Sequence, residues 1–327
     1  MKPFRSRAQA HVKRALIVNP ASGSGLREKD LAYVLRFFER RGQALRIFYT
    51  EYPGHATGLA RKAAEEGCEV VIGAGGDGTI NEVLNGLVGT GAKLGVIPWG
   101  TGNVFAREMG FPRGVKRLCR VLWRNRSLRL DLGKADGRYF LLMCGAGLDA
   151  YALSQHFDPG RKSRLGILSY FVMGLRALVR YRYPEIEAIL PGGRVERCSF
   201  ALVSNTSRYG PFFTLSPRAD PLDGELDVFL YRQKGTLSTL RLAAAVIAGA
   251  VLGRDPLKRR PFRGSLSFRT AALELRSAGQ VRLQLDGDPA GSLPLRIEVS
   301  PHTLSCVLPW FRIRLMLRRT VSSWLFQ

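Results

Sequence analysis

Three glycine-rich segments contain the residues most able to do chemistry. They are residues 19–25 (NPASGSG), 75–81 (GGDGTIN) and 98–103 (PWGTGN). Glycines let backbone N–H groups approach phosphate oxygens, and a helix that begins directly after such a loop favours an anion at its N-terminus. A single loop of this kind is often only a turn. Three of them in one half of a chain predict a site for the phosphates of a nucleotide.

One acidic residue stands inside these segments. Asp77 is not a natural partner for phosphate, so we expect it to hold Mg²⁺ or to accept a hydroxyl proton. Thr79 and Thr101 can each cap a helix and contact a phosphate. The sequence has no complete GxGxxG after its first predicted strand, no Walker A pattern and no protein-kinase HRD or DFG set. The residues therefore indicate a phosphate site of another kind.

The elements that position these loops follow from hydrophobic periodicity. Residues 15–18, 44–49, 69–74 and 94–98 have the character of buried strands, and helical spacing between them predicts crossover helices. This alternation predicts a parallel α/β sheet, which binds ligands at the carboxyl ends of its strands. After about residue 125 the pattern changes to short strands separated by Gly/Pro turns. It predicts a mostly-β sandwich or barrel-like domain, interrupted by helices around 165–180 and 237–252.

The amino-acid composition indicates the kind of cellular compartment and the kinds of binding partner that suit this chain. The 50 Lys and Arg residues outnumber the 26 Asp and Glu residues by 24, and the pI is near 10.7. Such a charge favours a polyanionic partner, or reflects a generally basic proteome. Five scattered cysteines and four histidines form no disulfide framework and no zinc motif, which indicates a reducing compartment. No secretory signal is recognisable, and the longest interior apolar stretch, Leu242–Leu252, is too short to span a bilayer.

Taken in order, the three segments resemble a known family. NPxSG from Asn19, GGDGTINE from Gly75 and PxGTGNxFAR from Pro98 are similar to the signature of the diacylglycerol/sphingosine lipid kinases, and most similar to the bacterial diacylglycerol kinase-like branch. GAGLDA at 145–150, DGxLD at 223–227 and LDGD at 285–288 extend the resemblance over nearly the whole chain.

The resemblance implies a domain plan and an ATP site. Residues 11–125 would form an α/β nucleotide-binding domain and residues 126–308 a β-sandwich lipid-acceptor domain, with ATP in the cleft between them. Whether the β-sandwich domain takes back the chain end is left open. The residues implied to contact ATP are Asn19, Ser22, Gly23, Thr50, Gly75, Gly76, Asp77, Gly78, Thr79, Ile80, Asn81 and Thr101.

The resemblance also implies catalytic and metal-binding residues. Asp288 stands where the family usually has a glutamate that accepts the hydroxyl proton, and some relatives give that role to the aspartate corresponding to Asp77. Asp220, Asp223 and Glu225 match a stretch in which relatives bind a structural Mg²⁺, partly through backbone carbonyls. A polar turn before the next strand is the alternative.

The sequence departs from the family pattern at one further position. Val104 stands where relatives of the bacterial branch often have an aspartate, so one carboxylate of the expected acidic network is missing. Asp131, Asp149 and Arg107 match the rest of that network, in a catalytic or a structural role. Diacylglycerol, which the resemblance implies, is the first choice of acceptor, and the missing carboxylate leaves ceramide or a sphingoid base open as the second. His55 is interpreted as a packed or helix-cap histidine.

Residues 309–327 form a basic tail rich in aromatic residues. Trp310, Ile313, Leu317, Val321 and Trp324 fall near one helical face, flanked by arginines. This pattern predicts either an interfacial helix on an anionic membrane surface or a terminal segment that docks on the protein's own core, and the need of a lipid kinase to reach its substrate favours the membrane. We therefore expect a cytoplasmic lipid kinase that is peripheral on the inner face of the membrane. The oligomeric state is left open.

Three other functions compete with this hypothesis. They are a kinase for a soluble acceptor such as NAD, a nucleotide-binding module without catalysis, and a nucleic-acid-binding protein. The sequence contains no recognised DNA- or RNA-binding signature, so no nucleic-acid partner is expected.

Overall fold

The computed structural model describes residues 13–23, 27–156, 177–251 and 262–324. The chain divides into two compact units, which are considered separately. The first unit contains residues 1–130 and 302–327, and the second contains residues 131–301.

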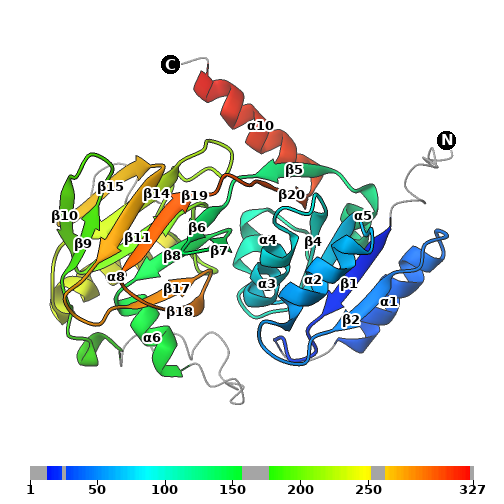
Figure 1. Ribbon diagram of the computed structural model, residues 1–327, viewed down its shortest axis with the longest axis horizontal. Helices are drawn as coiled ribbons and strands as arrows, with labels where there is room; N and C mark the ends of the chain where they lie inside the picture. The colour runs from blue at the N-terminus through cyan, green and yellow to red at the C-terminus, as the bar shows by residue number, and fades with distance from the viewer. Residues whose placement is uncertain (1–12, 24–26, 157–176, 252–261, 325–327) are drawn as a thin grey trace. The chain divides into compact units, whose positions relative to one another are not determined.

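The first unit is built on one mixed sheet with the strand order β2-β1-β3-β4-β20-β5 (Figure 1). Neighbouring strands from β2 to β20 are parallel, and β5 is antiparallel to β20. The strands are β1 Arg14–Val18, β2 Arg46–Tyr49, β3 Val70–Gly75, β4 Lys93–Pro98, β5 Ser127–Leu130 and β20 Leu304–Val307. The predicted parallel α/β sheet is confirmed, because β1 to β4 coincide with the four runs that sequence periodicity indicated.

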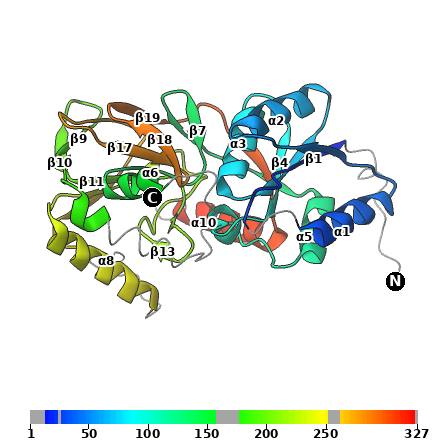
Figure 2. The same ribbon diagram turned by 90° about the horizontal axis from the view of Figure 1, so that it is seen from below.

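Helices cover both faces of this sheet. They are α1 Glu28–Glu39, α2 His55–Glu65, α3 Asp77–Leu87, α4 Val104–Glu108, α5 Val115–Arg124 and α10 Trp310–Trp324. Figure 2 shows α1 and α5 on one side of the sheet, and α2 and α3 on the other. Phe38 of α1 and Leu122 of α5 pack with Ile72 of β3 in one buried cluster. On the opposite face Gly73 leaves room for Ile80 and Val83 of α3.

The second unit is a sandwich of two antiparallel sheets. Their strand orders are β10-β9-β16-β19-β6-β7 and β15-β14-β11-β8-β17-β18, and β12 and β13 form a separate pair. The strands are β6 Gly133–Ala135, β7 Arg138–Phe140, β8 Met143–Ala146, β9 Ile186–Ile189, β10 Val195–Cys198, β11 Phe200–Ser204, β12 Arg208–Tyr209, β13 Phe213–Thr214, β14 Leu226–Tyr231, β15 Ser265–Thr270, β16 Ala272–Arg276, β17 Arg282–Leu285, β18 Asp288–Ser292 and β19 Leu295–Val299.

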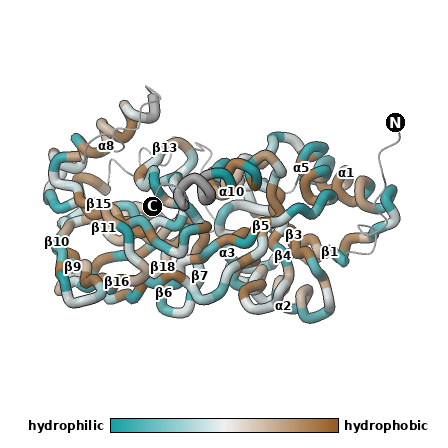
Figure 3. Tube along the Cα trace, turned by 90° about the horizontal axis from the view of Figure 1, so that it is seen from above, coloured by the Kyte–Doolittle hydropathy of each residue, from teal (hydrophilic) through white to brown (hydrophobic). Residues whose placement is uncertain are grey.

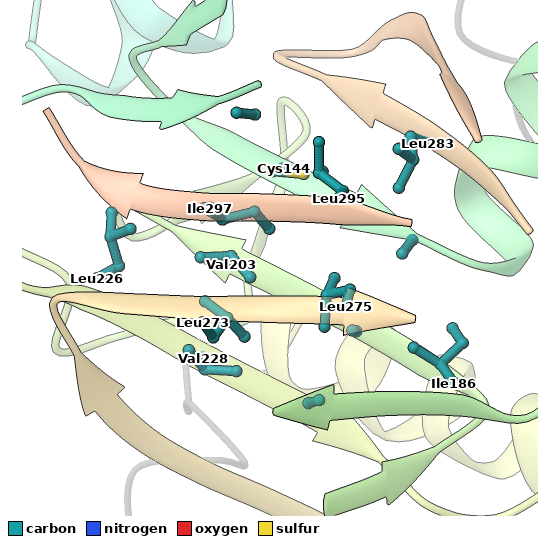
Figure 4. Close-up of a cluster of buried hydrophobic side chains, with 14 of the residues drawn as sticks. Cys144, Ile186, Val203, Leu226, Val228, Leu273, Leu275, Leu283, Leu295 and Ile297 are labelled. Carbon is teal, nitrogen blue, oxygen red and sulfur yellow. The ribbon is translucent and has the colours of Figure 1, made fainter. Parts of the chain in front are cut away.

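The core of the second unit lies between these two sheets. Leu273 and Ile297 of the first sheet share a buried cluster with Val203 and Val228 of the second (Figure 4). The predicted β-sandwich is therefore confirmed. The unit also contains α6 Leu148–His156 and α8 Thr236–Val251, of which α8 matches the helix expected around 237–252. Most of the helix expected around 165–180 lies outside the described residues.

The structural units differ from the expected domain ranges by a few residues at both ends of the second range. Residues 126–308 were expected to form one domain, but β5 and β20 pair with each other in the sheet of the first unit. Alternation of apolar and polar residues can reveal a strand in the sequence. It does not reveal the strand with which it pairs, because pairing depends on contacts between residues that are distant in sequence. The chain end therefore returns to the first unit.

The last helix, α10, is packed on the first unit by one face. Ile313 and Met316 are buried, Arg312 Nη2 lies 3.1 Å from Glu108 Oε1, and the ring of Phe311 lies against Gly110. The alternative of docking on the protein's own core therefore holds for the face of α10 that carries Ile313 and Met316. Among side chains that the structure describes, Phe311, Leu315 and Leu317 are exposed, and hydrophobic and hydrophilic residues are mixed along the helix (Figure 3). None of the helices in the described parts of the chain combines the length and the hydropathy needed to cross a membrane.

Candidate functional site

The three glycine-rich loops meet at the carboxyl ends of β1, β3 and β4. We call residues 19–23, 75–79 and 98–103 the phosphate-loop cluster. The first two loops are joined by side chains: Asn19 Nδ2 donates to Thr79 Oγ1 at 2.9 Å, and Ser22 Oγ accepts from the Gly76 N–H at 3.3 Å. A backbone bond from Asn19 N to Ala74 O at 3.0 Å continues the pairing of the strands into the loop.

The third loop is held to the second by the strand ends and by Asp77. The Trp99 N–H donates to Gly75 O at 2.8 Å. The Asp77 carboxylate accepts from the backbone N–H groups of Val104 at 2.9 Å and Phe105 at 3.0 Å, which caps the N-terminus of α4. Burial raises the pKa of Asp77, and these backbone hydrogen bonds oppose the rise. Asp77 therefore positions the loops even before any ligand is considered.

Two glycines let the loop backbones touch. Gly23 has φ +59°, and a Cβ there would overlap the carbonyl oxygen of Trp99. A Cβ at Gly100 would overlap the Cα of Gly76. Only glycine fits such approaches, and the same absence of side chains leaves backbone N–H groups accessible to a phosphate.

The other residues that were predicted to contact the nucleotide have different surroundings. Thr50 follows β2, and its N–H donates to Val18 O at 2.9 Å beside the first loop. Thr101 is exposed in the third loop. Ile80 and Asn81 are buried in α3, where Asn81 Oδ1 accepts from Asn85 Nδ2 at 3.1 Å. The side chains of Ile80 and Asn81 therefore support the phosphate-loop cluster from within α3.

Sequence reasoning did not assign a role to Glu82. Its carboxylate accepts from the N–H groups of Gly54 at 2.8 Å and Ala56 at 3.1 Å, so it caps the start of α2 from the neighbouring helix. Its place at the end of the GGDGTINE run was the available signal. His55 Nδ1 accepts from the Glu51 N–H at 3.2 Å, and its ring stacks on Tyr52 with centroids 4.5 Å apart, so His55 is a packed residue at the start of α2.

In the second unit, Asp286 fixes the turn that carries Asp288. The Asp286 carboxylate is buried and accepts from three successive backbone N–H groups, those of Leu141, Leu142 and Met143, at 2.8 to 3.0 Å. Asp286 has φ +51° and Gly287 φ +93°, as a tight hairpin turn requires. Asp288 follows as the first residue of β18 and is half-buried.

A side-chain network supports the same turn from its other side. Gln284 Oε1 accepts from the Gly287 N–H at 2.8 Å, and Gln284 Nε2 donates to Asp149 Oδ2 at 3.3 Å. The Tyr209 hydroxyl also donates to Asp149. Burial raises the pKa of Asp149 to about 6. Neither Gln284 nor Tyr209 could be recognised from the sequence, because their roles depend on strands that meet only in the fold.

The predicted metal ligands lie in a different environment from the one expected. No group of three or more Asp, Glu, His or Cys side chains in the described residues is arranged to hold a metal ion. Arg269 Nη1 lies 3.0 Å from Glu225 Oε2, and Arg269 Nη2 contacts Asp223 Oδ2. A guanidinium therefore already neutralises two of the three predicted ligands. Asp220, Asp223 and Glu225, as they lie, do not fit Mg²⁺.

Asp131, Arg107 and Val104 have structural contacts. Asp131 Oδ2 accepts from the Gly224 N–H at 2.9 Å, which anchors the acidic turn to the start of the second unit. Arg107 Nε donates to Gly102 O at 2.9 Å and brings a positive charge to the third phosphate loop. Val104 is buried, and its N–H is bound to Asp77.

Comparisons with known proteins agree with this geometry. Residues 13–135 match the model of the diacylglycerol kinase catalytic domain, and residues 143–308 match the model of the YegS C-terminal NAD kinase beta sandwich-like domain. A diacylglycerol kinase of Bacillus subtilis (strain 168) is 31% identical over 86% of this chain and 92% of its own length. A diacylglycerol kinase of Staphylococcus aureus (strain JH9) is 30% identical over 86% of this chain and 88% of its own.

Solved structures share the fold. A protein from Bacillus anthracis strain Sterne has a TM-score of 0.75, with 22% identity over 91% of this chain and 98% of its own. A diacylglycerol kinase from the same strain has a TM-score of 0.67, with 21% identity over 91% and 97%.

Proposed function

Because this chain belongs to the diacylglycerol kinase catalytic-domain family and is a kinase of that lipid-kinase family, we propose that it transfers the γ-phosphate of ATP to a lipid hydroxyl. Diacylglycerol is the first choice of acceptor, and ceramide or a sphingoid base the second. The observation that carries the proposal is the convergence of three glycine-rich loops in the first unit.

ATP is proposed to bind with its phosphates on the phosphate-loop cluster. Backbone N–H groups at Gly23 and Gly78, with the N-terminus of α3, supply the partial positive charge that phosphate oxygens need. Asn19, Ser22, Thr79 and Thr101 add polar side chains. Mg²⁺ enters with the nucleotide as the MgATP substrate and neutralises charge on the transferred phosphoryl group.

The proposed step is an in-line transfer. The lipid hydroxyl oxygen forms a bond to the γ-phosphorus, the bond from that phosphorus to the β–γ bridging oxygen breaks, and ADP leaves. The hydroxyl proton passes to a carboxylate. We assign this role to Asp288, because both oxygens of Asp77 already accept backbone N–H groups and Asp288 stands on a turn fixed from two sides.

The test is transfer of labelled phosphate from [γ-³²P]ATP to diacylglycerol, ceramide, sphingosine, phosphatidylglycerol and monoacylglycerol in mixed micelles, with NAD as a soluble acceptor. We expect one lipid to be labelled, and Asp288→Asn to lower kcat by about 10²-fold or more while ATP still binds. Asp30→Asn on α1 is the matched control. Labelling of NAD alone, or of no acceptor, would contradict the proposal.

We also propose that α10 places the enzyme on an anionic membrane surface. Its exposed side chains include Phe311, Leu315 and Leu317 beside Arg314 and Arg318. Apolar side chains interleaved with arginines are the pattern of a helix that lies in the headgroup region. The packing of Ile313 and Met316 on the first unit leaves this other face for the lipid.

A further inference from the structure

An arginine lies within the acidic cluster of the second unit. Asp223, Glu225 and Asp227 each contact a different nitrogen of the Arg269 side chain: Nη2 contacts Asp223, Nη1 lies 3.0 Å from Glu225 Oε2, and Nε lies 3.5 Å from Asp227 Oδ2. The guanidinium group of Arg269 therefore forms ion pairs with three carboxylates.

The position of Arg269 is set by strand register. Asp227 of β14 is directly opposite Arg269 of β15, in an antiparallel pair that continues from Leu226–Thr270 to Tyr231–Ser265. Cross-strand partners on one face lie close enough for opposite charges to pair. The arginine is thus delivered to the cluster by the sheet, and the carboxylates of the preceding turn close around it.

The cluster needs a cation because its carboxylates are partly buried. Burial raises the pKa of Asp223 and of Asp227 to about 6, and the charge of Arg269 opposes the rise in both. Asp131, whose pKa burial also raises, accepts from the Gly224 N–H in the middle of the same turn. Without a positive charge, these acids would repel one another and loosen the turn.

We propose that Arg269 is the built-in cation of this turn, so that the second unit needs no divalent metal there. A metal would require the oxygens to converge on one point at about 2.0–2.6 Å. Here they are distributed around a planar group that binds each acid through a separate nitrogen. This inference is independent of the proposed function.

The test measures thermal unfolding without nucleotide or lipid, in EDTA and in Mg²⁺. We expect the Tm of the parent protein to be the same in both. Arg269→Gln should lose several degrees in EDTA and regain part of that loss in Mg²⁺, because the freed carboxylates can then bind the ion. Arg269→Lys should be intermediate and insensitive to Mg²⁺.

The matched control is Arg276→Gln. Arg276 is an exposed arginine on β16 of the same unit and pairs with Glu274. Its replacement should change neither Tm nor the response to Mg²⁺. A parent protein that is destabilised by EDTA and restored by Mg²⁺ would overturn the proposal, as would an Arg269→Gln variant whose Tm ignores Mg²⁺.

A second measurement covers the case in which Arg269→Gln does not fold. Binding of Mn²⁺, as a paramagnetic substitute for Mg²⁺, can be followed on the nucleotide-free parent by electron paramagnetic resonance. We expect no bound Mn²⁺ that depends on Asp223. An ion that binds the parent and is lost in Asp223→Asn would refute the role of Arg269.

Discussion

The carboxylate of Asp77 accepts the backbone N–H of Val104 at 2.9 Å. Val104 occupies the position at which the family resemblance suggested another acid, and its contribution here is the amide rather than the side chain. With the bond to Phe105, this contact ties the loop after β3 to the first turn of α4.

Replacing Asp77 should therefore weaken both the fold and nucleotide binding. In Asp77→Asn only one side-chain oxygen can accept, so one buried amide loses its partner at a cost of about 1–3 kcal/mol. We expect a lower midpoint of urea unfolding and about a tenfold weaker affinity for ATP, measured by calorimetry. An unchanged unfolding midpoint would show that the cap contributes little.

Gly23→Ala tests the contact between the first and third loops. The new Cβ would overlap Trp99 O and would have to accept φ +59°. We expect ATP affinity to fall by about tenfold or more, since an energy near 1.4 kcal/mol already gives that factor. Gly42→Ala is the control: it has φ +77° but nothing within 4 Å of the added Cβ, and it should leave ATP binding intact. Equal losses in both variants would refute the steric argument.

Two of the Asp-Gly turns of the second unit, at Asp286 and at Asp136, should respond differently to the same change. Asp286→Asn removes a buried charge that three backbone amides bind, and should lower the free energy of unfolding by about 2–3 kcal/mol. Asp136→Asn, in an exposed turn with φ +43° and one 3.3 Å bond from Arg296 N, should cost far less. Urea unfolding measures both. Similar losses would contradict the anchoring role of Asp286.

The raised pKa of Asp149 predicts the direction in which the stability of the protein changes with pH. Its pKa in the folded state is about 6, above the ordinary 3.8, so between these values the native state binds more protons than the unfolded state. Stability from this group therefore falls as pH rises from about 4 to 6. The asparagine in Asp149→Asn cannot titrate. The free energy of unfolding of this variant, relative to the parent, should therefore increase by about 2 kcal/mol as the pH rises across this window.

The measurement is urea unfolding of both proteins from pH 4 to 7. Asp131, Asp223 and Asp227 also have raised pKa values, but their effects cancel in the difference between the two proteins. A difference that stays constant with pH would argue against an elevated pKa at Asp149.

The exposed face of α10 should determine membrane binding. A Leu315→Gln, Leu317→Gln double variant should sediment less with vesicles that contain phosphatidylglycerol, and an Arg314→Gln, Arg318→Gln double variant should lose the preference over phosphatidylcholine vesicles. Ile47→Gln, at an exposed apolar residue of β2, is the control. If neither double variant changes sedimentation, α10 is not the membrane contact.

The sequence was sufficient for much of the fold and for the phosphate loops. Parallel strands end at one edge of a sheet, so loops at 19, 75 and 98 had to come together once β1, β3 and β4 were recognised. The role of Arg269 was not predictable, because its partners are set by the pairing of β15 with β14. Glu82 was visible within a motif, but its partners, the amides at Gly54 and Ala56, are fixed only by the packing of α2 on α3.

The return of β20 to the first sheet has a consequence for biosynthesis. β20 lies between β4 and β5, so residues 1–130 leave the ribosome without the strand that joins β5 to the rest of the sheet. The sandwich of residues 131–301 is complete in the nascent chain before Leu304–Val307 is synthesised. The first unit, although most of it is encoded first, therefore closes its sheet last, and a chain that stops early carries an open strand edge of the kind that promotes aggregation.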